Sequence, residues 1–184
     1  MQKMGKPVKK CKVCKAEFPA ARPLMVCCSI PCAMTYARQK AVKVNAKKAQ
    51  IERKDYREAK QKAKSRGQWL KEAQTAFNAY IRKRDEGLPC ISCGSHTGKK
   101  NAGHYRSVGS CPELRFEPLQ VWLQCEKCNS YLSGNLINYR IELIRRIGAD
   151  KGEWLEGPHE PKKYTIPELM AIKAEYKLKL KTLD

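Results

Sequence analysis

His104 lies between two Cys-x-x-Cys pairs, Cys90/Cys93 before it and Cys125/Cys128 after it. Two such pairs about thirty residues apart can supply the four thiolates of one tetrahedral Zn²⁺ ion. A zinc ion whose four positions are all filled by protein cannot activate a water molecule, so this site is expected to be structural. Any chemistry must then be done by neighbouring side chains, and a neutral imidazole is well suited to accept a proton near pH 7. A purely structural histidine is the alternative.

A second set of cysteines lies in residues 11–32. Cys11 and Cys14 form a Cys-x-x-Cys pair, and Cys28 and Cys32 can complete another four-thiolate zinc site. Cys27, next to Cys28, is an alternative ligand. A segment this short buries too little surface to fold alone, so metal binding must supply its folding free energy. The sequence therefore predicts about two structural zinc ions per chain.

The charge of the chain favours a polyanionic partner. Among 184 residues, 38 are Lys or Arg and 18 are Asp or Glu, which gives a formal net charge of +20. Such an excess is costly through self-repulsion, and nucleic acid relieves it with a gain from counterion release. No apolar run approaches the roughly 18 residues of a membrane span, and the basic first residues lack the apolar core of a secretory signal. We expect no membrane association and a reducing, cytoplasmic setting without disulfides.

Residues 33–68 favour a long basic helix, because they are rich in good helix formers and contain no proline. Twelve basic and three acidic residues lie between Arg38 and Arg66, and the few apolar residues make no continuous stripe. Such a helix is expected to grip DNA by phosphate contacts, which position the protein without reading sequence. A solvated linker without specific contacts is the alternative. The residues expected to bind DNA here are Lys47, Lys48, Arg53, Lys54, Arg57 and Lys60.

Other helices are predicted from apolar periodicity and capping signals. Apolar residues recur at three- and four-residue steps over residues 69–81 and again over residues 136–147. Thr165 and Glu168 have the spacing of a capping box, which predicts the start of a last helix. The polar residues 149–163 are expected to form a loop.

The stretch between the Cys90/Cys93 pair and the Cys125/Cys128 pair predicts a β-hairpin. Residues 103–107 alternate in character around His104, and residues 114–116 and 121–123 suit a returning strand. After Cys128 a helix is expected to start, with Asn129 beside the last thiolate. Along the chain, a Cys-x-x-Cys pair (a zinc knuckle) is therefore followed by a hairpin that carries a histidine. A second knuckle, an asparagine and a helix come next. This order resembles the ββα-metal nuclease motif, also called HNH or endonuclease VII-like.

The resemblance implies that His104 is the general base and that Asn129 binds a catalytic Mg²⁺ or Mn²⁺ ion. The two cysteine pairs around them would hold the structural zinc. These nucleases usually have Asp or another ligand directly before the histidine, where this chain has Gly103. Asn101 is the first substitute ligand, because on a strand it shares the face of position 103, and Asn135 is the second.

Three more residues are expected to support this site. Arg106 and Arg115 flank His104 in the sequence and are predicted to bind a DNA phosphate, with surface solvation as the alternative. The asparagine that braces the hairpin in the broad motif falls at Gln120, whose amide can make the same kind of hydrogen bond.

A narrower resemblance follows from several strings taken together. "LPCISCG", "AGHYRS", "LRF", "QCxxCNxxxSGN", "YRIELIxRIG" and "AIKAEY" together look like the phage NinG/Rap family of recombination endonucleases. That resemblance implies cleavage of branched double-stranded DNA, namely D-loops and Holliday-type junctions, by metal-dependent phosphodiester hydrolysis. It also implies phage recombination proteins as partners, and a homodimer suits a two-fold junction.

The sequence thus predicts an α+β protein with a small ββα-metal core flanked by helices. The expected parts are a zinc knuckle (1–34), a basic helical linker (35–68), the core with its leading helix (69–148), and a loop with a C-terminal helix (149–184). The rival hypothesis is a non-catalytic double-zinc protein that binds DNA or recruits recombination proteins, and Gly103 is its best support.

Overall fold

The computed structural model describes residues 7–183, which form a mixed α+β structure with two small two-stranded sheets. The α+β class expected from the sequence is confirmed at this level. The chain divides into two compact units, Met1–Ala63 and Lys64–Asp184. Every helix within residues 7–183 is too short or too polar to cross a bilayer.

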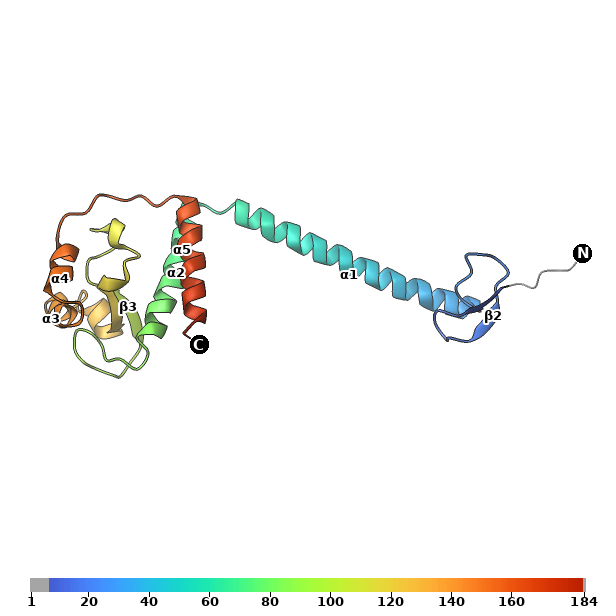
Figure 1. Cartoon of the computed structure of the whole chain (residues 1–184), viewed down its shortest axis with the longest axis horizontal. Helices are drawn as coiled ribbons and strands as arrows, with labels where there is room; N and C mark the ends of the chain where they lie inside the picture. The colour runs from blue at the N-terminus through green and yellow to red at the C-terminus, as the bar shows by residue number, and fades with distance from the viewer. Residues whose placement is uncertain (1–6, 184) are drawn as a thin grey trace, which may run out of the picture. The chain divides into compact units, whose positions relative to one another are not determined.

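The first unit consists of a short hairpin and one long helix (Figure 1). Strands β1 (Val8–Lys10) and β2 (Glu17–Pro19) are antiparallel, with Lys9 opposite Phe18. Helix α1 (Ile30–Lys62) begins after Ser29, whose hydroxyl accepts a hydrogen bond from the backbone N–H of Cys32. None of the side chains of α1 is buried. The single basic helix expected over residues 33–68 is therefore two helices, because α1 ends at Lys62 and a new cap follows.

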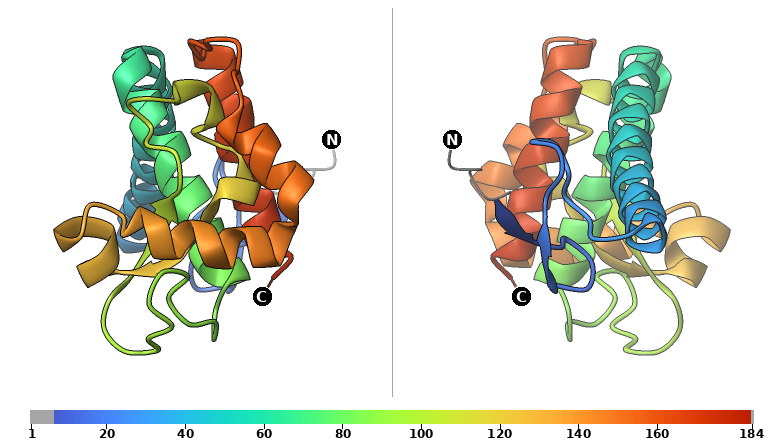
Figure 2. Two further views of the ribbon diagram at one scale, coloured as in Figure 1. Left: turned by 90° about the vertical axis from the view of Figure 1, so that its left-hand side faces the viewer. Right: turned by 90° about the vertical axis from the view of Figure 1, so that its right-hand side faces the viewer.

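The second unit is built on two helices that lie side by side, α2 (Arg66–Arg84) and α5 (Ile166–Lys181) (Figure 2). Phe77 of α2 is fully buried and meets Tyr176 of α5 edge to face, with ring centroids 4.8 Å apart. Both helices start with capping boxes, in which a Ser or Thr hydroxyl and a Gln or Glu side chain bond each other's backbone N–H. The predicted capping box at Thr165 and Glu168 is confirmed.

A hairpin of two strands packs between α2 and the following helices. Strand β3 (Lys100–His104) pairs with β4 (Val121–Cys125), with His104 opposite Val121 and Lys100 opposite Cys125. Two short 3₁₀ turns connect them, η1 (Pro112–Leu114) and η2 (Pro118–Gln120). The hydroxyl of Tyr139 ties the hairpin to the next helix, because it lies 2.8 Å from Gly103 O and accepts a bond from Trp122 N at 3.0 Å.

The segment after β4 differs from the prediction in two places. Asn129 does not begin an α-helix; it lies in a π-helical turn, η3 (Lys127–Tyr131), and α3 (Leu136–Ile147) starts only after a left-handed turn that ends at Asn135. Part of the loop expected over residues 149–163 is instead helix α4 (Ala149–Glu156). Its internal Gly152 looks like a helix breaker, yet a Cβ there would lie 1.9 Å from Ile144 Cδ1, so the glycine allows α4 to pack closely on α3.

Gly103 has a packing role within the hairpin. A Cβ at this position would lie 2.2 Å from Gln124 Oε1 and 2.9 Å from Gln124 Cβ. Gln124 is fully buried, and its Nε2 donates to Ser92 Oγ at 2.7 Å and to Gly134 O at 2.6 Å. The absence of a side chain at Gly103 therefore leaves room for the Gln124 amide. That amide connects Ser92, in the Cys90/Cys93 pair, with Gly134, in the turn after Cys128.

We predict that Gly103→Ala lowers the free energy of unfolding by about 1–3 kcal/mol, because the methyl group overpacks the space of Gln124. Gly109→Ala is the matched control, since the nearest atom to a Cβ there is 3.9 Å away. The control should stay within about 0.5 kcal/mol of the parent. Urea unfolding of the zinc-loaded proteins measures both values, and equal losses in the two variants would contradict this packing role.

Candidate active site and metal centres

The cysteines around the hairpin form one metal-binding cluster. The sulfur atoms of Cys90, Cys93, Cys125 and Cys128 all lie within 4.8 Å of one another. Cys93 Sγ and Cys125 Sγ are 3.7 Å apart, close to the edge of about 3.8 Å expected for a tetrahedron with Zn–S bonds of about 2.3 Å. Burial raises the pKa of the Cys90 thiol, but backbone N–H groups of the two knuckles outweigh it and lower that pKa to about 7. This cluster can bind zinc.

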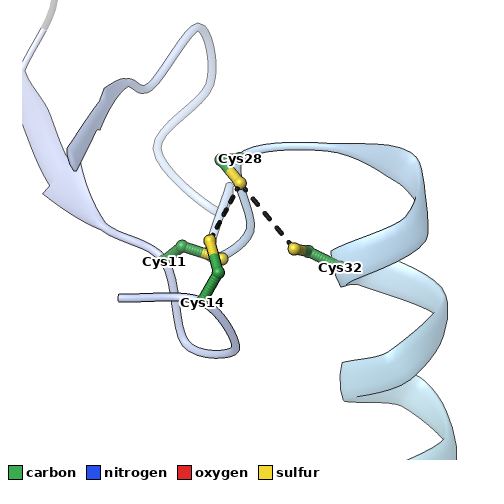
Figure 3. Close-up of side chains that lie close together, drawn as sticks. All are labelled: Cys11, Cys14, Cys28 and Cys32. Atoms are coloured by element: carbon green, nitrogen blue, oxygen red, sulfur yellow. Dashed lines mark hydrogen bonds between the residues drawn. The ribbon is translucent and has the colours of Figure 1, made fainter. Parts of the chain in front are cut away.

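The N-terminal cysteines form the second cluster (Figure 3). Cys28 Sγ lies 3.4 Å from Cys14 Sγ and 3.8 Å from Cys32 Sγ, and Cys11 completes the group. Cys27 is buried in the small core beside it and is not a member. The alternative between Cys27 and Cys28 is therefore decided for Cys28, and the two clusters together can bind two zinc ions.

Asn135 supports the zinc cluster of the hairpin and does not line the cleft described next. Its Nδ2 donates to Cys128 Sγ at 3.5 Å, and its Oδ1 accepts from Asn138 Nδ2 at 3.0 Å. Burial raises the pKa of the Cys128 thiol to about 12, and the hydrogen bond from Asn135 opposes part of that rise by stabilising the thiolate. The amide is thus committed to the zinc cluster and to Asn138.

A cleft of about 610 Å³ opens beside the end of β3. Its walls come from α2, from β3 and the loop after it, and from the turn that follows Cys128. His104 and Asn129, the two residues predicted to do the chemistry, both line it. Arg106 and Arg115 line it as well. The structure therefore brings an imidazole, an amide and two guanidinium groups into one cleft.

His104 is half-buried, and its hydrogen bond fixes the tautomer of the ring. Nε2 lies 3.0 Å from the carbonyl oxygen of Arg115, and a carbonyl can only accept, so Nε2 carries the proton. In the neutral ring Nδ1 then holds the free lone pair. Burial lowers the pKa of His104 below its ordinary value of 6.5, and this effect exceeds the rise caused by hydrogen bonds to the backbone of Arg115 and Ala102. The imidazole is therefore neutral at physiological pH.

The two arginines of the cleft both donate hydrogen bonds to uncharged oxygens. Arg106 donates from one guanidinium nitrogen to the carbonyls of Leu155 and Glu156 at the end of α4. Arg115 donates to Gln74 Oε1 at 3.2 Å and, at 3.5 Å, to Val108 O, and no carboxylate within residues 7–183 forms an ion pair with it. The charge of Arg115 is therefore available to an anion in the cleft.

Asn129 presents an unoccupied oxygen. Its one side-chain hydrogen bond within the described part of the chain is a long one, from Nδ2 to Ser130 Oγ at 3.5 Å, so Oδ1 has no donor. Asn101 lies elsewhere: on β3 it alternates with Ala102 and His104, which line the cleft, and it sits opposite the buried Gln124. Of the three asparagines considered as metal ligands, Asn129 is the one that lines the cleft.

Gln120 braces the hairpin as its position in the sequence predicts. It is fully buried, its Oε1 accepts from Arg106 N at 2.7 Å, and its Nε2 donates to Leu114 O at 2.6 Å. These bonds hold the loop that carries Arg115 O against the strand that carries His104. The orientation of the imidazole therefore depends on this amide.

Among the cleft residues that the sequence did not predict are Gln74 and Asn78 of α2. Gln74 Nε2 donates to Asn78 Oδ1 at 2.8 Å while its Oε1 holds Arg115. The sequence did contain one sign of this pair: two amide side chains four residues apart, beside the apolar face of the predicted helix over residues 69–81. That signal places the pair on a flank of α2 but does not say which loop the flank meets.

The basic residues predicted to bind DNA along α1 are exposed. Two of them form weak ion pairs within the helix, Lys48 with Glu52 at 3.9 Å and Lys54 with Glu58 at 3.8 Å. Such exposed pairs contribute little and leave the charges available to a polyanion. The exposed set is Lys47, Lys48, Arg53, Lys54, Arg57 and Lys60.

Comparison with known proteins gives one consistent result. The family described as bacteriophage lambda NinG protein matches residues 3–184. Protein ninG of Escherichia phage 933W is 42% identical over 193 residues, covering 98% of this chain and 96% of the relative. Protein ninG of Escherichia phage lambda is 50% identical over 121 residues, covering 65% of this chain and 59% of the relative. That of Salmonella phage P22 is 49% identical over the same length, with 65% and 60% covered. No solved structure matches the chain.

Zinc content tests the ligand assignment with two adjacent cysteines. The parent should contain about two zinc ions per chain by elemental analysis after purification. Cys28→Ala should lose about one of them, because three thiolates hold zinc far less tightly than four. Cys27→Ala should keep both. Equal zinc losses in the two variants would reject the assignment.

Proposed function

This chain belongs to the family of the bacteriophage lambda NinG protein, and from that membership and the cleft we propose that it is a metal-dependent, structure-specific DNA endonuclease. The proposed substrates are branched recombination intermediates, D-loops and Holliday-type junctions, which the sequence resemblance to recombination endonucleases implies. One observation carries the proposal: a single cleft is lined by both His104 and Asn129. The succession of β3, β4 and α3 around a four-cysteine cluster supports a ββα-metal core.

His104 is the proposed general base. Because Nε2 is held by the Arg115 carbonyl, Nδ1 accepts the proton of a water molecule whose oxygen bonds to phosphorus. The bond from phosphorus to the 3′ oxygen breaks, and that oxygen leaves with a proton taken from solvent. The lowered pKa of His104 keeps the base neutral at pH 7. Because the Arg115 carbonyl holds Nε2, the orientation of the ring, and with it the direction of the Nδ1 lone pair, is fixed before the substrate binds. Catalysis benefits from such preorganisation.

Asn129 is the proposed ligand of Mg²⁺ or Mn²⁺, through an Oδ1 that lacks any donor in the described chain. The donor suits the ion, because these cations prefer hard oxygen atoms and Mg²⁺ retains several waters, so few protein ligands are needed. When bound, the ion would polarise the phosphate and stabilise the leaving oxygen. Cys128, one residue earlier, belongs to the zinc cluster, which holds Asn129 in place.

DNA binding is proposed to combine two surfaces. Arg115, which lacks a carboxylate partner in residues 7–183, is placed to bind a phosphate inside the cleft. The exposed lysines and arginines of α1 add sequence-independent affinity for the arms of a branched substrate. A two-fold junction suits a homodimer, and phage recombination proteins are the proposed further partners.

One observation favours the rival function, a non-catalytic zinc protein that binds or recruits. Gly103 offers no ligand, and the volume its side chain would fill is occupied by Gln124. The proposed ion therefore has one side-chain ligand, Asn129, among the amides considered. The two functions differ in a simple respect, because the rival predicts that the parent protein binds junctions without cutting them.

We predict that His104→Ala slows junction cleavage by about 10²- to 10⁴-fold, the usual contribution of a general base, while junction binding is retained. His96→Ala is the matched control, because His96 is exposed and does not line the cleft. Cleavage of a labelled four-way junction in Mg²⁺ or Mn²⁺ and a gel-shift assay without metal separate the two effects. Absence of cleavage by the parent would support the rival function.

The pH dependence of cleavage follows from the environment of His104. Its pKa lies below 6.5 because burial disfavours the imidazolium, so lowering the pH through neutrality should leave the base unprotonated. Single-turnover rates should therefore hold from about pH 8 to about pH 7 and fall only below about pH 6.5. A decline with a midpoint above pH 7 would mean that another group, or a histidine with a raised pKa, limits the reaction.

A further inference from the structure

Helix α1 carries an apolar seam with a seven-residue repeat. Ile30, Ala37, Val44 and Ile51 follow one another at intervals of seven, and Met34 and Ala41 fall between them. An ideal helix drifts by about 20° per heptad relative to such a repeat, so two helices that keep it in contact wind around each other with a left-handed supercoil. In the sequence alone this seam is obscured by Val42, which lies on another face.

The seam is fully open to solvent. Ile30, Val44 and Ile51 are 78%, 63% and 51% exposed, and no side chain of α1 is buried. A solitary helix of this kind gains nothing from packing, whereas a row of exposed apolar residues on one face, here interrupted by Lys48, marks a contact surface. The stripe therefore needs a covering partner.

At its N-terminal end the seam meets an apolar groove beside the N-terminal cysteine cluster (Cys11, Cys14, Cys28 and Cys32), which we call the zinc module. This groove of about 440 Å³ is lined by Ile30 itself, by Ala33 and Tyr36 of α1, and by Leu24 and Met25 of the preceding loop. Leu24 is 92% exposed. The groove and the seam thus form one apolar surface that begins at the cysteine cluster and ends near Ile51.

We propose that this surface pairs with the same surface of a second copy of the chain, as a parallel two-stranded coiled coil. The heptad repeat matches itself, which an unrelated ligand has no reason to do. The seam ends where Asp55, Glu58 and Lys62 take the corresponding positions, so pairing stops short of the C-terminal end of α1. The proposal does not depend on nuclease activity, because no residue of the seam lines the cleft.

The charges beside the seam favour the parallel orientation. In a parallel pair, Lys47 flanks the seam opposite Glu52 of the partner subunit, which gives an attractive contact across the interface. Lys40, Lys47 and Lys54 recur every seven residues along one flank of the seam. In an antiparallel pair this flank would face the same lysine-bearing flank of the second copy, which is repulsive. Lys48 occupies a seam position, where pairing removes it from the basic surface proposed to bind DNA, and a polar residue there specifies the register at a cost in stability.

The parallel arrangement has consequences for the whole molecule. It places the N-terminal cysteine clusters of the two copies at the same end of the coiled coil, and a pair of identical chains in either orientation has the two-fold symmetry that a junction presents. Because α1 carries ten basic and three acidic residues, repulsion opposes pairing, and added salt should strengthen the dimer by screening it.

Two valines of α1 provide a matched test in the full-length, zinc-loaded protein. Val44 lies on the seam and Val42 does not, although they are 63% and 68% exposed. Val44→Asp should raise the dimer dissociation constant at least about tenfold, and Val42→Asp should change it less than about twofold. Lys48→Leu should lower it. Sedimentation velocity over a nanomolar to micromolar series measures these constants, and circular dichroism and zinc content establish that each variant is folded.

The outcomes are separable. Selective dissociation of the Val44→Asp dimer supports the seam, and a Glu52→Lys dimer that is weakened and then restored by Lys47→Glu supports the parallel orientation. A parent that stays monomeric throughout the series overturns the proposal, as does equal weakening by Val42→Asp and Val44→Asp. Loss of dimerisation with unchanged cleavage per active site would leave the proposed chemistry standing.

Discussion

The convergence of four sulfur atoms at the end of the hairpin is the constraint on which the candidate site depends. Cys125 ends β4 and Cys128 precedes Asn129, so whatever fixes this cluster also fixes the start of the turn that carries the proposed metal ligand. A tetrahedral ion bound by thiolates is rigid, and its ligands come from segments more than thirty residues apart. The strands and turns between these segments also bury apolar side chains, among them Leu114, Phe116 and Val121, so the four cysteines act together with the apolar core of the second unit.

A set of buried amides complements the metal tie. Gln124 connects Ser92 of the first knuckle with Gly134, and Gln120 connects the β3 end with the loop that bonds His104. Buried polar groups are costly unless they are hydrogen-bonded, so the bonded Nε2 of Gln124 and the two bonded amide atoms of Gln120 favour a single arrangement of the segments that they join, although Gln124 Oε1 has no partner in the described chain. The zinc cluster and these amides together position the imidazole and the Asn129 oxygen from opposite ends of the same hairpin.

Much of this organisation was predictable from local chemistry. Cysteine spacing gave both clusters, because ligand geometry allows few alternatives, and capping residues gave the start of α5. The features that the sequence did not predict depend on tertiary contacts. Gly152 looks like a breaker until Ile144 packs against it, and Gly103 looks like a lost ligand until Gln124 fills its place. Likewise Gln74 and Asn78 reach the cleft only because α2 packs against the hairpin, and the heptad seam of α1 emerges only once its helical phase is fixed.

The central claim is that a divalent cation binds at Asn129, in the cleft that His104 also lines. Paramagnetic Mn²⁺ titrated into isotope-labelled, zinc-loaded protein tests it directly, because the ion broadens the NMR signals of nearby nuclei. The account predicts early broadening of the Asn129 side-chain amide and the His104 ring signals, with the Asn101 and Asn135 amides affected later. Broadening centred elsewhere, or none below the concentrations that affect exposed carboxylates, would contradict it.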